Sequence, residues 1–335
     1  MYKNNDFIYD ATVKLEELTN SPVQFTSTRK NYDAIIIFKR QSFNVEARSE
    51  IRASNKGIVL SDTEIIKKKT KRPVILVARY IAQEIAIELR ELGINYIDIA
   101  GNAYINEGEI FVLISGQKTQ YQQKTNQARA FQEAGIKLIF NLLNNPENLQ
   151  LSYRELAEQA NISIGSVSNI IQELEGMNFI LKTSSNRILK NTPDLLNRWI
   201  IAYSDILRPR ILKKRLRFAD KEHSSTWRTL DIQEFDFNNL WGSEPAAALL
   251  TRQFSPAKYT IYTDGNWQSI SRQLKLIPDE NGEIEILQIF WKEKKENKNK
   301  TTPALLVYAD LLSSGFERNI QIAKRILNNE LQNIK

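Results

Sequence analysis

Residues 152–180 read SYRELAEQANISIGSVSNIIQELEGMNFI, and this stretch contains two helix-start signals separated by a short turn. Ser152 and, three residues later, Glu155 form a capping box, which predicts a helix that ends near Gln159. Ser163 is a favourable N-cap residue, so a second helix is expected over 163–175. The apolar residues of this second helix recur at helical spacing and predict its buried face: Val167, Ile171 and Leu174.

The other face of the 163–175 helix consists of small or polar residues that could approach the floor of a DNA groove. Asn and Gln can form two hydrogen bonds with an adenine, and Ser can bond either kind of base. The residues expected to read bases are Ser163, Gly165, Ser166, Ser168, Asn169 and Gln172.

Two short segments with alternating apolar residues follow, 179–182 and 187–190, and four polar residues separate them. They predict a β-hairpin whose basic residues would contact phosphates: Lys182, Arg187 and Lys190. A helical segment at 128–143 would support the two helices from behind. The whole block, 128–190, resembles bacterial winged-helix regulators and predicts a winged helix-turn-helix that binds double-stranded DNA.

The charge of this block does not favour DNA by itself, because residues 127–190 contain equal numbers of acidic and basic residues. DNA affinity comes mainly from phosphate contacts, so additional cations are needed. A basic run beyond the hairpin is the candidate source: Arg208, Arg210, Lys213 and Lys214. The same run could instead be an exposed helix face, and the block could be a helical module that contacts only protein.

The composition narrows the classes of function. The chain has 335 residues, no cysteine, a single histidine (His223) and a net charge of +7 at pH 7. Disulfides and thiolate metal sites are excluded, and a zinc site with several His ligands is excluded too. No run approaches the roughly 18 apolar residues of a membrane span, and residues 1–10 lack an apolar signal core. We expect a cytoplasmic protein with no membrane association, no metal and no cofactor.

The length suits two or three domains. The first segment, 1–121, predicts a helix at 6–18, strands at 23–28, 32–38, 42–48 and 73–78, a helix at 81–92, and strands at 95–99 and 110–114. A lysine-rich loop is expected at 67–72 and a polar linker at 118–126. This order of elements resembles the restriction-endonuclease-like fold, with a helix packed on a mixed sheet.

Active enzymes of that fold place an acid on one strand and Asp/Glu-x-Lys on the next, where they hold magnesium and position water. The candidates here are Asp33, Glu46 and Arg48. Arginine stands where the lysine is expected, and it is effectively always protonated, so it cannot take the acid–base role of lysine. We therefore expect an inactive domain and keep a metal-dependent nuclease as the alternative.

The third segment, 191–335, predicts an α/β domain. Strands are expected at 259–262, 285–290 and 303–312, a turn into a helix at 241–251, and a last helix that ends near residue 331. Glu244 would lie near the favourable N-terminal end of its helix. Glu244 and Asp310 are the candidate acids for a nucleotidyl-transfer alternative, although the chain has no Walker-type G-x-x-x-x-G-K and no G-x-G-x-x-G motif.

Five further stretches, in order along the chain, carry a family resemblance. They are PVILVARYIAQEIA (73–86), NYIDIAGNAYI (95–105), LLNRWIIAYSDILRPRIL (195–212), WGSEPAAALLT (241–251) and PALLVYADLL (303–312) with Arg318-Asn319 after it. Together with the winged-helix block, they resemble the abortive-infection type IV antitoxin family of AbiEi-like bacterial regulators. The resemblance implies a transcriptional repressor of its own toxin–antitoxin operon, with a nucleotidyltransferase-like toxin as partner. The best-known members begin with the winged helix, whereas this chain has a nuclease-like segment first.

The sequence thus predicts a multidomain α/β (α+β) protein with domains at 1–121, 128–190 and 191–335. The expected function is that of a DNA-binding, autorepressing regulator with no enzymatic activity, which acts on an operator as a homodimer or as paired monomers. Two alternatives are kept: the metal-dependent nuclease, and an interaction scaffold whose outer segments bind a toxin.

Overall fold

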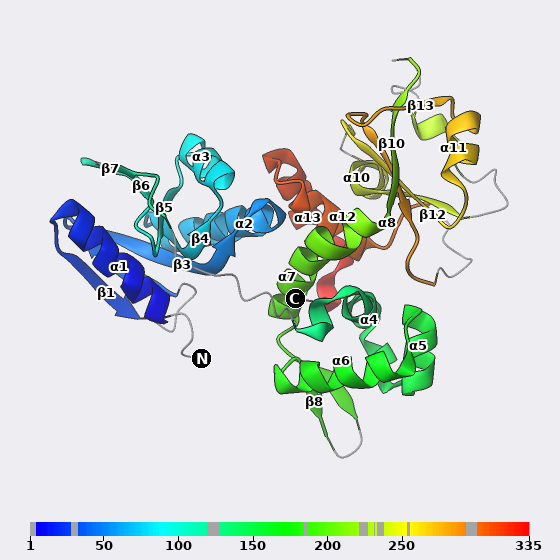
Figure 1. Ribbon diagram of the computed structural model, residues 1–335, viewed down its shortest axis with the longest axis horizontal. Helices are drawn as coiled ribbons and strands as arrows, with labels where there is room; N and C mark the ends of the chain where they lie inside the picture. The colour runs from blue at the N-terminus through cyan, green and yellow to red at the C-terminus, as the bar shows by residue number, and fades with distance from the viewer. Residues whose placement is uncertain are drawn as a thin grey trace. The chain divides into compact units, whose positions relative to one another are not determined.

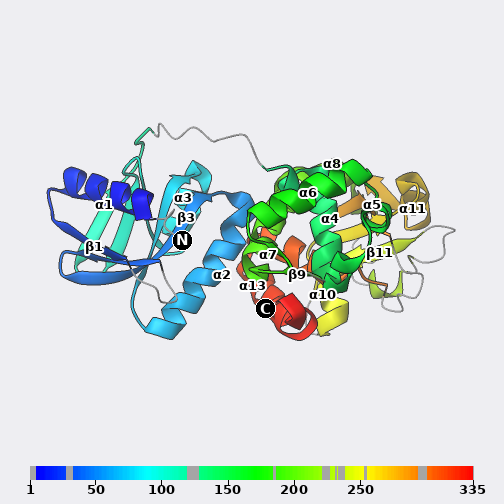
Figure 2. The same cartoon turned by 90° about the horizontal axis from the view of Figure 1, so that it is seen from below.

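The computed structural model describes residues 5–27, 33–118, 128–183, 186–220, 227–230, 232, 238–252, 255–292 and 300–334. His223, the hairpin residues 184–185 and most of the expected linker at 118–126 lie outside these ranges. The chain forms two units, Met1–Lys124 and Thr125–Lys335, which Figures 1 and 2 show in two views. Both units mix helices with β-sheet, so the expected α/β (α+β) class is confirmed.

The described part of the first unit contains a seven-stranded mixed sheet whose strands lie side by side in chain order. The pairs β3–β4 and β4–β5 are parallel, and the outer pairs are antiparallel. The central strand β4 reads VILVARYI, a nearly continuous apolar run, as a strand covered on both faces requires. The bounds are β1 Val23–Ser27, β2 Ala34–Phe38, β3 Gln41–Ile51, β4 Val74–Ile81, β5 Asn95–Asp98, β6 Ala103–Glu107 and β7 Ile110–Ile114.

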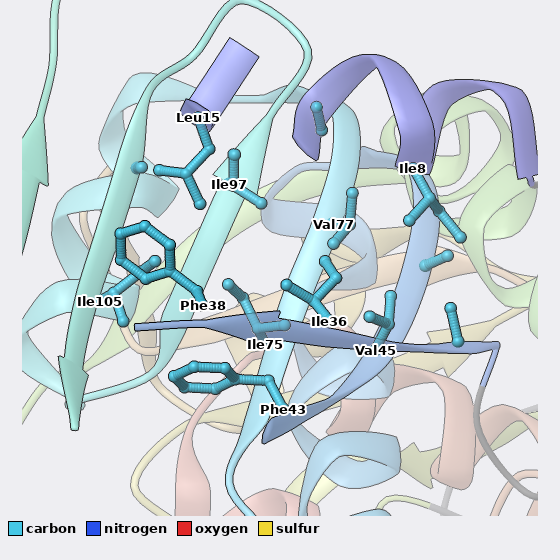
Figure 3. Packing of buried hydrophobic residues seen from close by; sticks show 14 of the residues in the cluster. Ile8, Leu15, Ile36, Phe38, Phe43, Val45, Ile75, Val77, Ile97 and Ile105 are labelled. Carbon is cyan, nitrogen blue, oxygen red and sulfur yellow. The ribbon is translucent and has the colours of Figure 1, made fainter. Parts of the chain in front are cut away.

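Helices cover both faces of this sheet: α1 (Asn5–Thr19) on one, α2 (Ala53–Thr70) and α3 (Gln83–Glu91) on the other. Ile8 and Leu15 of α1 belong to the same buried cluster as sheet residues such as Ile36 and Ile97 (Figure 3). The strands alternate their side chains between the two faces. The opposite face is buried by a second cluster that includes Val59, Leu76, Ile85 and Leu89.

The prediction of a loop at 67–72 is wrong. Lys67, Lys68 and Lys69 form the last turn of α2, and Lys71 is its C-cap in the left-handed conformation. The apolar residues of α2 show no regular helical spacing, so periodicity alone does not indicate this helix. Two effects favour it nonetheless. The parallel pair β3–β4 needs a crossover connection, which is usually a helix, and lysines in the last turn interact favourably with the helix dipole.

The first unit therefore runs in the order helix, three antiparallel strands, helix, parallel strand. With α3 and the strands β5–β7 that follow, the order matches the expected one except for two elements that were not predicted, the helix α2 and the strand β6. The assignment of the unit to the restriction-endonuclease-like fold stays a prediction.

The second unit begins with helices and a hairpin. A short 3₁₀ turn (Arg129–Phe131) precedes α4, so the helical segment expected at 128–143 is broken near Gln132, whose backbone is extended. The hairpin strands β8 and β9 pair antiparallel and lie next to α6 (Figure 1). The bounds are α4 Glu133–Asn144, α5 Tyr153–Ala160, α6 Ile164–Gly176, β8 Ile180–Lys182 and β9 Arg187–Leu189, with a 3₁₀ turn at Pro146–Gln150.

The rest of the second unit is built around a sheet that has five strands in its described part, in the order β11-β12-β14-β10-β13. Its strands are β10 Leu212–Phe218, β11 Asn239–Gly242, β12 Tyr259–Thr263, β13 Leu276–Pro278 and β14 Ile284–Gln288. Its helices are α7 Thr192–Ala202, a π-helical turn Tyr203–Leu207, α8 Arg208–Ile211, α10 Ser243–Thr251, α11 Trp267–Gln273, α12 Ala304–Ser313 and α13 Glu317–Glu330, with 3₁₀ turns at Trp227–Thr229 and Gln332–Ile334. The helix predicted at 241–251 is confirmed as α10, with Glu244 in its first turn.

The strand expected at 303–312 is wrong, because this segment forms the helix α12. Residues 305–312 are all buried, so the segment is apolar all round and has no helical stripe. A short apolar run of this kind fits a core strand or a core helix equally well by periodicity. Its Ala and Leu residues are strong helix formers, and the helix fills the space against α10 and α13.

A cluster of aromatic side chains joins the helical part of the second unit to its sheet part. The Trp199 ring stacks on Phe140 of α4 at 5.8 Å and on Tyr203 at 5.2 Å, between ring centroids. Its indole Nε1 donates to the carbonyl of Ile136, 2.9 Å away. Phe290, just after β14, lies 5.1 Å from Phe140. The helices that support α6 therefore pack directly against the C-terminal part, within one unit.

Candidate nucleic-acid interface

The turn between α5 and α6 is made by the residues that the sequence indicates. Ser152 and Glu155 form the capping box of α5, and the Ser152 backbone N–H donates to the Glu155 carboxylate at 2.8 Å. Asn161 ends α5 in the left-handed conformation (φ 52°). The Ser163 hydroxyl then accepts the backbone N–H of Ser166 at 3.1 Å and caps α6. The predicted pair of helices joined by a tight turn is confirmed.

Helix α6 has one buried and one exposed face. Its buried side chains are those predicted, with one addition: Val167, Ile170, Ile171 and Leu174. Of the residues expected to read bases, five are exposed: Ser163, Gly165, Ser168, Asn169 and Gln172. Ser166 is half-buried, and its hydroxyl lies 2.8 Å from that of Ser163. The exposed face therefore carries no charged side chain over the first two turns of the helix.

Ile164, the first residue of α6, is an exposed residue that the sequence reasoning missed. Its side chain is 52% exposed. The spacing from Ile164 to Val167 and Ile171 would place it on the buried stripe of the helix. The structure differs because the packing that covers Val167 does not cover the first turn.

The hairpin residues take different roles. Lys182 and Lys190 are exposed, as phosphate contacts require. Arg187 is half-buried, and its guanidinium donates to the Leu151 carbonyl at 2.7 Å and lies 5.2 Å from the centre of the Tyr153 ring. Arg187 therefore fixes the hairpin to the start of α5.

The basic run at 208–217 does not form one helix face, because only Arg208–Ile211 are helical and β10 follows. The guanidinium of Arg208 forms ion pairs inside the protein. Its side chain is 22% exposed, its Nε lies 3.0 Å from Asp310 and its Nη2 lies 2.7 Å from Glu285. It is therefore not placed to contact a phosphate, contrary to expectation.

The other cations of this run remain at the surface. Arg210 pairs with Glu133 of α4 at 3.0 Å but keeps 60% of its side chain exposed. Lys213 is exposed, and the Lys214 ammonium lies 5.7 Å from the centre of the Trp267 ring. Arg210 therefore adds positive charge beside α4, and Lys213 and Lys214 add it at the start of β10.

A buried polar cluster surrounds Asp310 of α12. Tyr203 and Tyr262 each donate to its carboxylate at 3.0 Å, and their own hydroxyl oxygens are 2.5 Å apart. Burial raises the pKa of both tyrosines well above its usual value, so both hydroxyls stay protonated donors. Burial opposes ionisation of Glu285, but the guanidiniums of Arg208 and Arg215 hold its pKa below the usual value.

Glu244 and Asp310 line the same cavity, of about 590 Å³. The Glu244 carboxylate accepts the backbone N–H of Ala257 at 2.6 Å, Arg318 at 2.7 Å and Asn319 at 3.0 Å. Every oxygen of both carboxylates thus accepts a bond from the protein itself. Within the described ranges, no group of three or more His, Asp or Glu residues is arranged to hold a metal ion. We interpret the two acids as anchors of the fold.

The candidate nuclease residues of the first unit do lie together. The Asp33 carboxylate accepts the backbone N–H of Ala47 at 2.8 Å, next to Glu46 on β3. Arg48 forms ion pairs with Glu46 and, at 2.5 Å, with Asp62 of α2, a residue that the sequence reasoning missed because α2 was not expected. Burial raises the pKa of Glu46 to about 7, and the Arg48 charge opposes this shift. The Arg48 guanidinium therefore pairs with Glu46, one of the two acids that a metal ion would need.

Comparison with known proteins found a family match for the C-terminal part of the chain. Residues 187–332 match the model of a family described as transcriptional regulator, AbiEi antitoxin, type IV toxin–antitoxin system. This stretch runs from β9 to the end of α13, and it is similar to a class of transcriptional regulators that act as antitoxins. No curated protein and no solved structure matches the chain. None of the helices in the described ranges is long and apolar enough to cross a membrane.

Proposed function

We propose that the protein is a DNA-binding transcriptional regulator that represses its own toxin–antitoxin operon. The observation that carries the proposal is the exposed face of α6, which presents small, uncharged hydrogen-bonding side chains on a capped helix after a tight turn. In the proposed winged helix-turn-helix, α6 is the recognition helix and β8–β9 is the wing. The family match at 187–332 supports the regulator and antitoxin role.

In this proposal α6 enters the major groove of double-stranded DNA. Asn169 and Gln172 read adenines, and Ser168 bonds a neighbouring base. Exposed cations contact the phosphates and fix the register, namely Lys182, Lys190, Arg210 and Lys213, together with the half-buried Lys214. Arg208 is left out of this set, because Asp310 and Glu285 hold its guanidinium.

We propose further that the protein works in the cytoplasm as a homodimer on inverted half-sites. A cognate nucleotidyltransferase-like toxin would bind the part that matches the antitoxin family. The regulator would need no enzymatic activity, metal or cofactor.

The test is binding of the full-length protein to the DNA upstream of its own gene and to random DNA of equal length, at two salt concentrations. Preference for the upstream DNA that survives the higher salt supports the proposal. Asn169→Ala should reduce this preference, whereas Asn281→Ala, at an exposed asparagine in the turn before β14, should not. Equal binding to both DNAs, or no binding, contradicts the proposal.

A metal-dependent nuclease is the second candidate, and the proximity of Asp33 to Glu46 favours it. Cleavage of DNA with Mg²⁺ or Mn²⁺ that Glu46→Ala abolishes would support this activity. The Arg48 guanidinium between Glu46 and Asp62 argues against it, and we expect no cleavage with either ion.

A further inference from the structure

The first turn of α6 contains an apolar side chain that the fold does not bury. Ile164 is 52% exposed, whereas Val167, Ile170, Ile171 and Leu174 are each at most 2% exposed. A single exposed apolar residue needs no explanation on an ordinary surface. Here it lies at the N-terminal end of the proposed recognition helix, where residues of such helices contact base edges.

The next residue, Gly165, is a second and independent observation. A Cβ added at Gly165 would meet none of the described atoms within 4 Å, and its φ is not positive. Neither packing nor backbone geometry therefore requires glycine at this helical position. Glycine is less favourable than alanine inside a helix, because it loses more backbone entropy on folding. Glycine at this position would instead be explained by another molecule that comes close to the α6 backbone.

Base edges in the major groove offer one apolar group, the C5-methyl of thymine. An exposed isoleucine beside a glycine suits such a contact, because the missing side chain lets the helix end move close to the groove floor. The small hydroxyl of Ser168, one turn further on, leaves the same approach open. No lysine or arginine on α6 offers the usual bidentate contact with guanine.

We propose that Ile164 is a specificity-determining residue that packs against a thymine methyl group in each half-site, with Gly165 at the point of closest approach. The inference rests on the proposed function and names part of the DNA sequence that α6 recognises. Burial of one methyl is worth about 0.8 kcal/mol, which is about a fourfold change in affinity.

The experiment compares upstream DNA that contains thymidine with the same DNA that contains deoxyuridine, which lacks only the methyl groups. The parent protein should bind the deoxyuridine DNA at least about fourfold more weakly. Ile164→Ala should bind thymidine DNA more weakly and should show a much smaller ratio between the two DNAs. Any general effect of deoxyuridine on DNA shape acts on parent and variant alike, so the difference between their ratios isolates the contact.

Ile87→Ala is the matched control. Ile87 lies on α3 of the first unit, outside the proposed DNA-binding elements, is 43% exposed and loses the same atoms, so this variant should keep the parent ratio. The inference is overturned if the parent prefers upstream DNA but binds both forms equally, or if Ile164→Ala keeps the parent ratio. Loss of preference for upstream DNA in the parent itself would instead reject the proposed function. If Ile164→Ala dissociates a dimer of the protein but keeps the parent ratio between the two DNAs, Ile164 belongs to a protein interface and not to the DNA contact.

Discussion

Replacement of Gly165 by alanine should change stability and DNA binding in opposite directions. The added methyl group meets open space, so no described neighbour has to move. Alanine is favoured over glycine in a helix because it loses less backbone entropy on folding. Alanine instead of glycine inside a helix stabilises a protein by about 0.5–1 kcal/mol, and near a helix end we expect a gain in unfolding free energy of about 0.5 kcal/mol. For a unit of this size the gain corresponds to about 1–2 °C in Tm.

The DNA affinity should fall in the same variant, because the Cβ would occupy the space through which α6 approaches the groove. We expect a loss of about fivefold or more, since overpacking a close contact typically costs 1–3 kcal/mol. The assays are thermal unfolding followed by tryptophan fluorescence, and binding to upstream DNA at fixed salt. All five tryptophans lie beyond residue 198, so fluorescence reports the second unit selectively in the full-length protein.

Gly176→Ala is the control for this prediction. Gly176 lies at the other end of α6, where an added Cβ also meets none of the described atoms within 4 Å. This variant should gain a similar stability and bind DNA like the parent. The reasoning is refuted if Gly165→Ala binds DNA as tightly as Gly176→Ala does, or if Gly165→Ala loses stability.

Three further outcomes follow from the contacts. Asp310→Asn removes the negative charge that pairs with the buried Arg208 guanidinium and should cost about 3 kcal/mol or more in a urea unfolding curve, whereas Asp264→Asn, at an exposed turn, should cost less than about 0.5 kcal/mol. Lys182→Ala should leave the Tm unchanged and reduce the slope of log affinity against log salt by about 0.9; an unchanged slope would remove Lys182 from the interface. The pKa of Glu46 is about 7 when folded and near 4.5 when unfolded, so its stabilising effect is complete below pH 4.5 and is lost as the pH rises through 7. In Glu46→Gln the stability of the first unit should therefore fall less over this pH window than in the parent. The measurement is the unfolding transition of the first unit in circular dichroism, which tryptophan fluorescence does not follow. Parallel pH profiles in both proteins would contradict the raised pKa of Glu46.

Local signals in the sequence were sufficient for much of the fold. The capping box at Ser152, the N-cap at Ser163 and the stripe from Val167 to Leu174 depend on residues within one or two helical turns of each other. Such short-range patterns are visible in the sequence whatever surrounds them. For the same reason the expected helix at 241–251 and most strands of the first unit agree with the structure.

Three features needed the tertiary structure. The helix α12 is buried on every side, so its sequence has no stripe that distinguishes it from a strand. Ile164 has the spacing of a core residue, and only the position where the packing ends exposes it. Arg208 reads as one of several surface cations, but its partner Asp310 lies 102 residues further along the chain. The sequence by itself determined where α5 and α6 start and which residues form most of the buried face of α6, because neighbouring residues decide both. Which cations remain free for DNA was decided only when the fold brought distant carboxylates next to them.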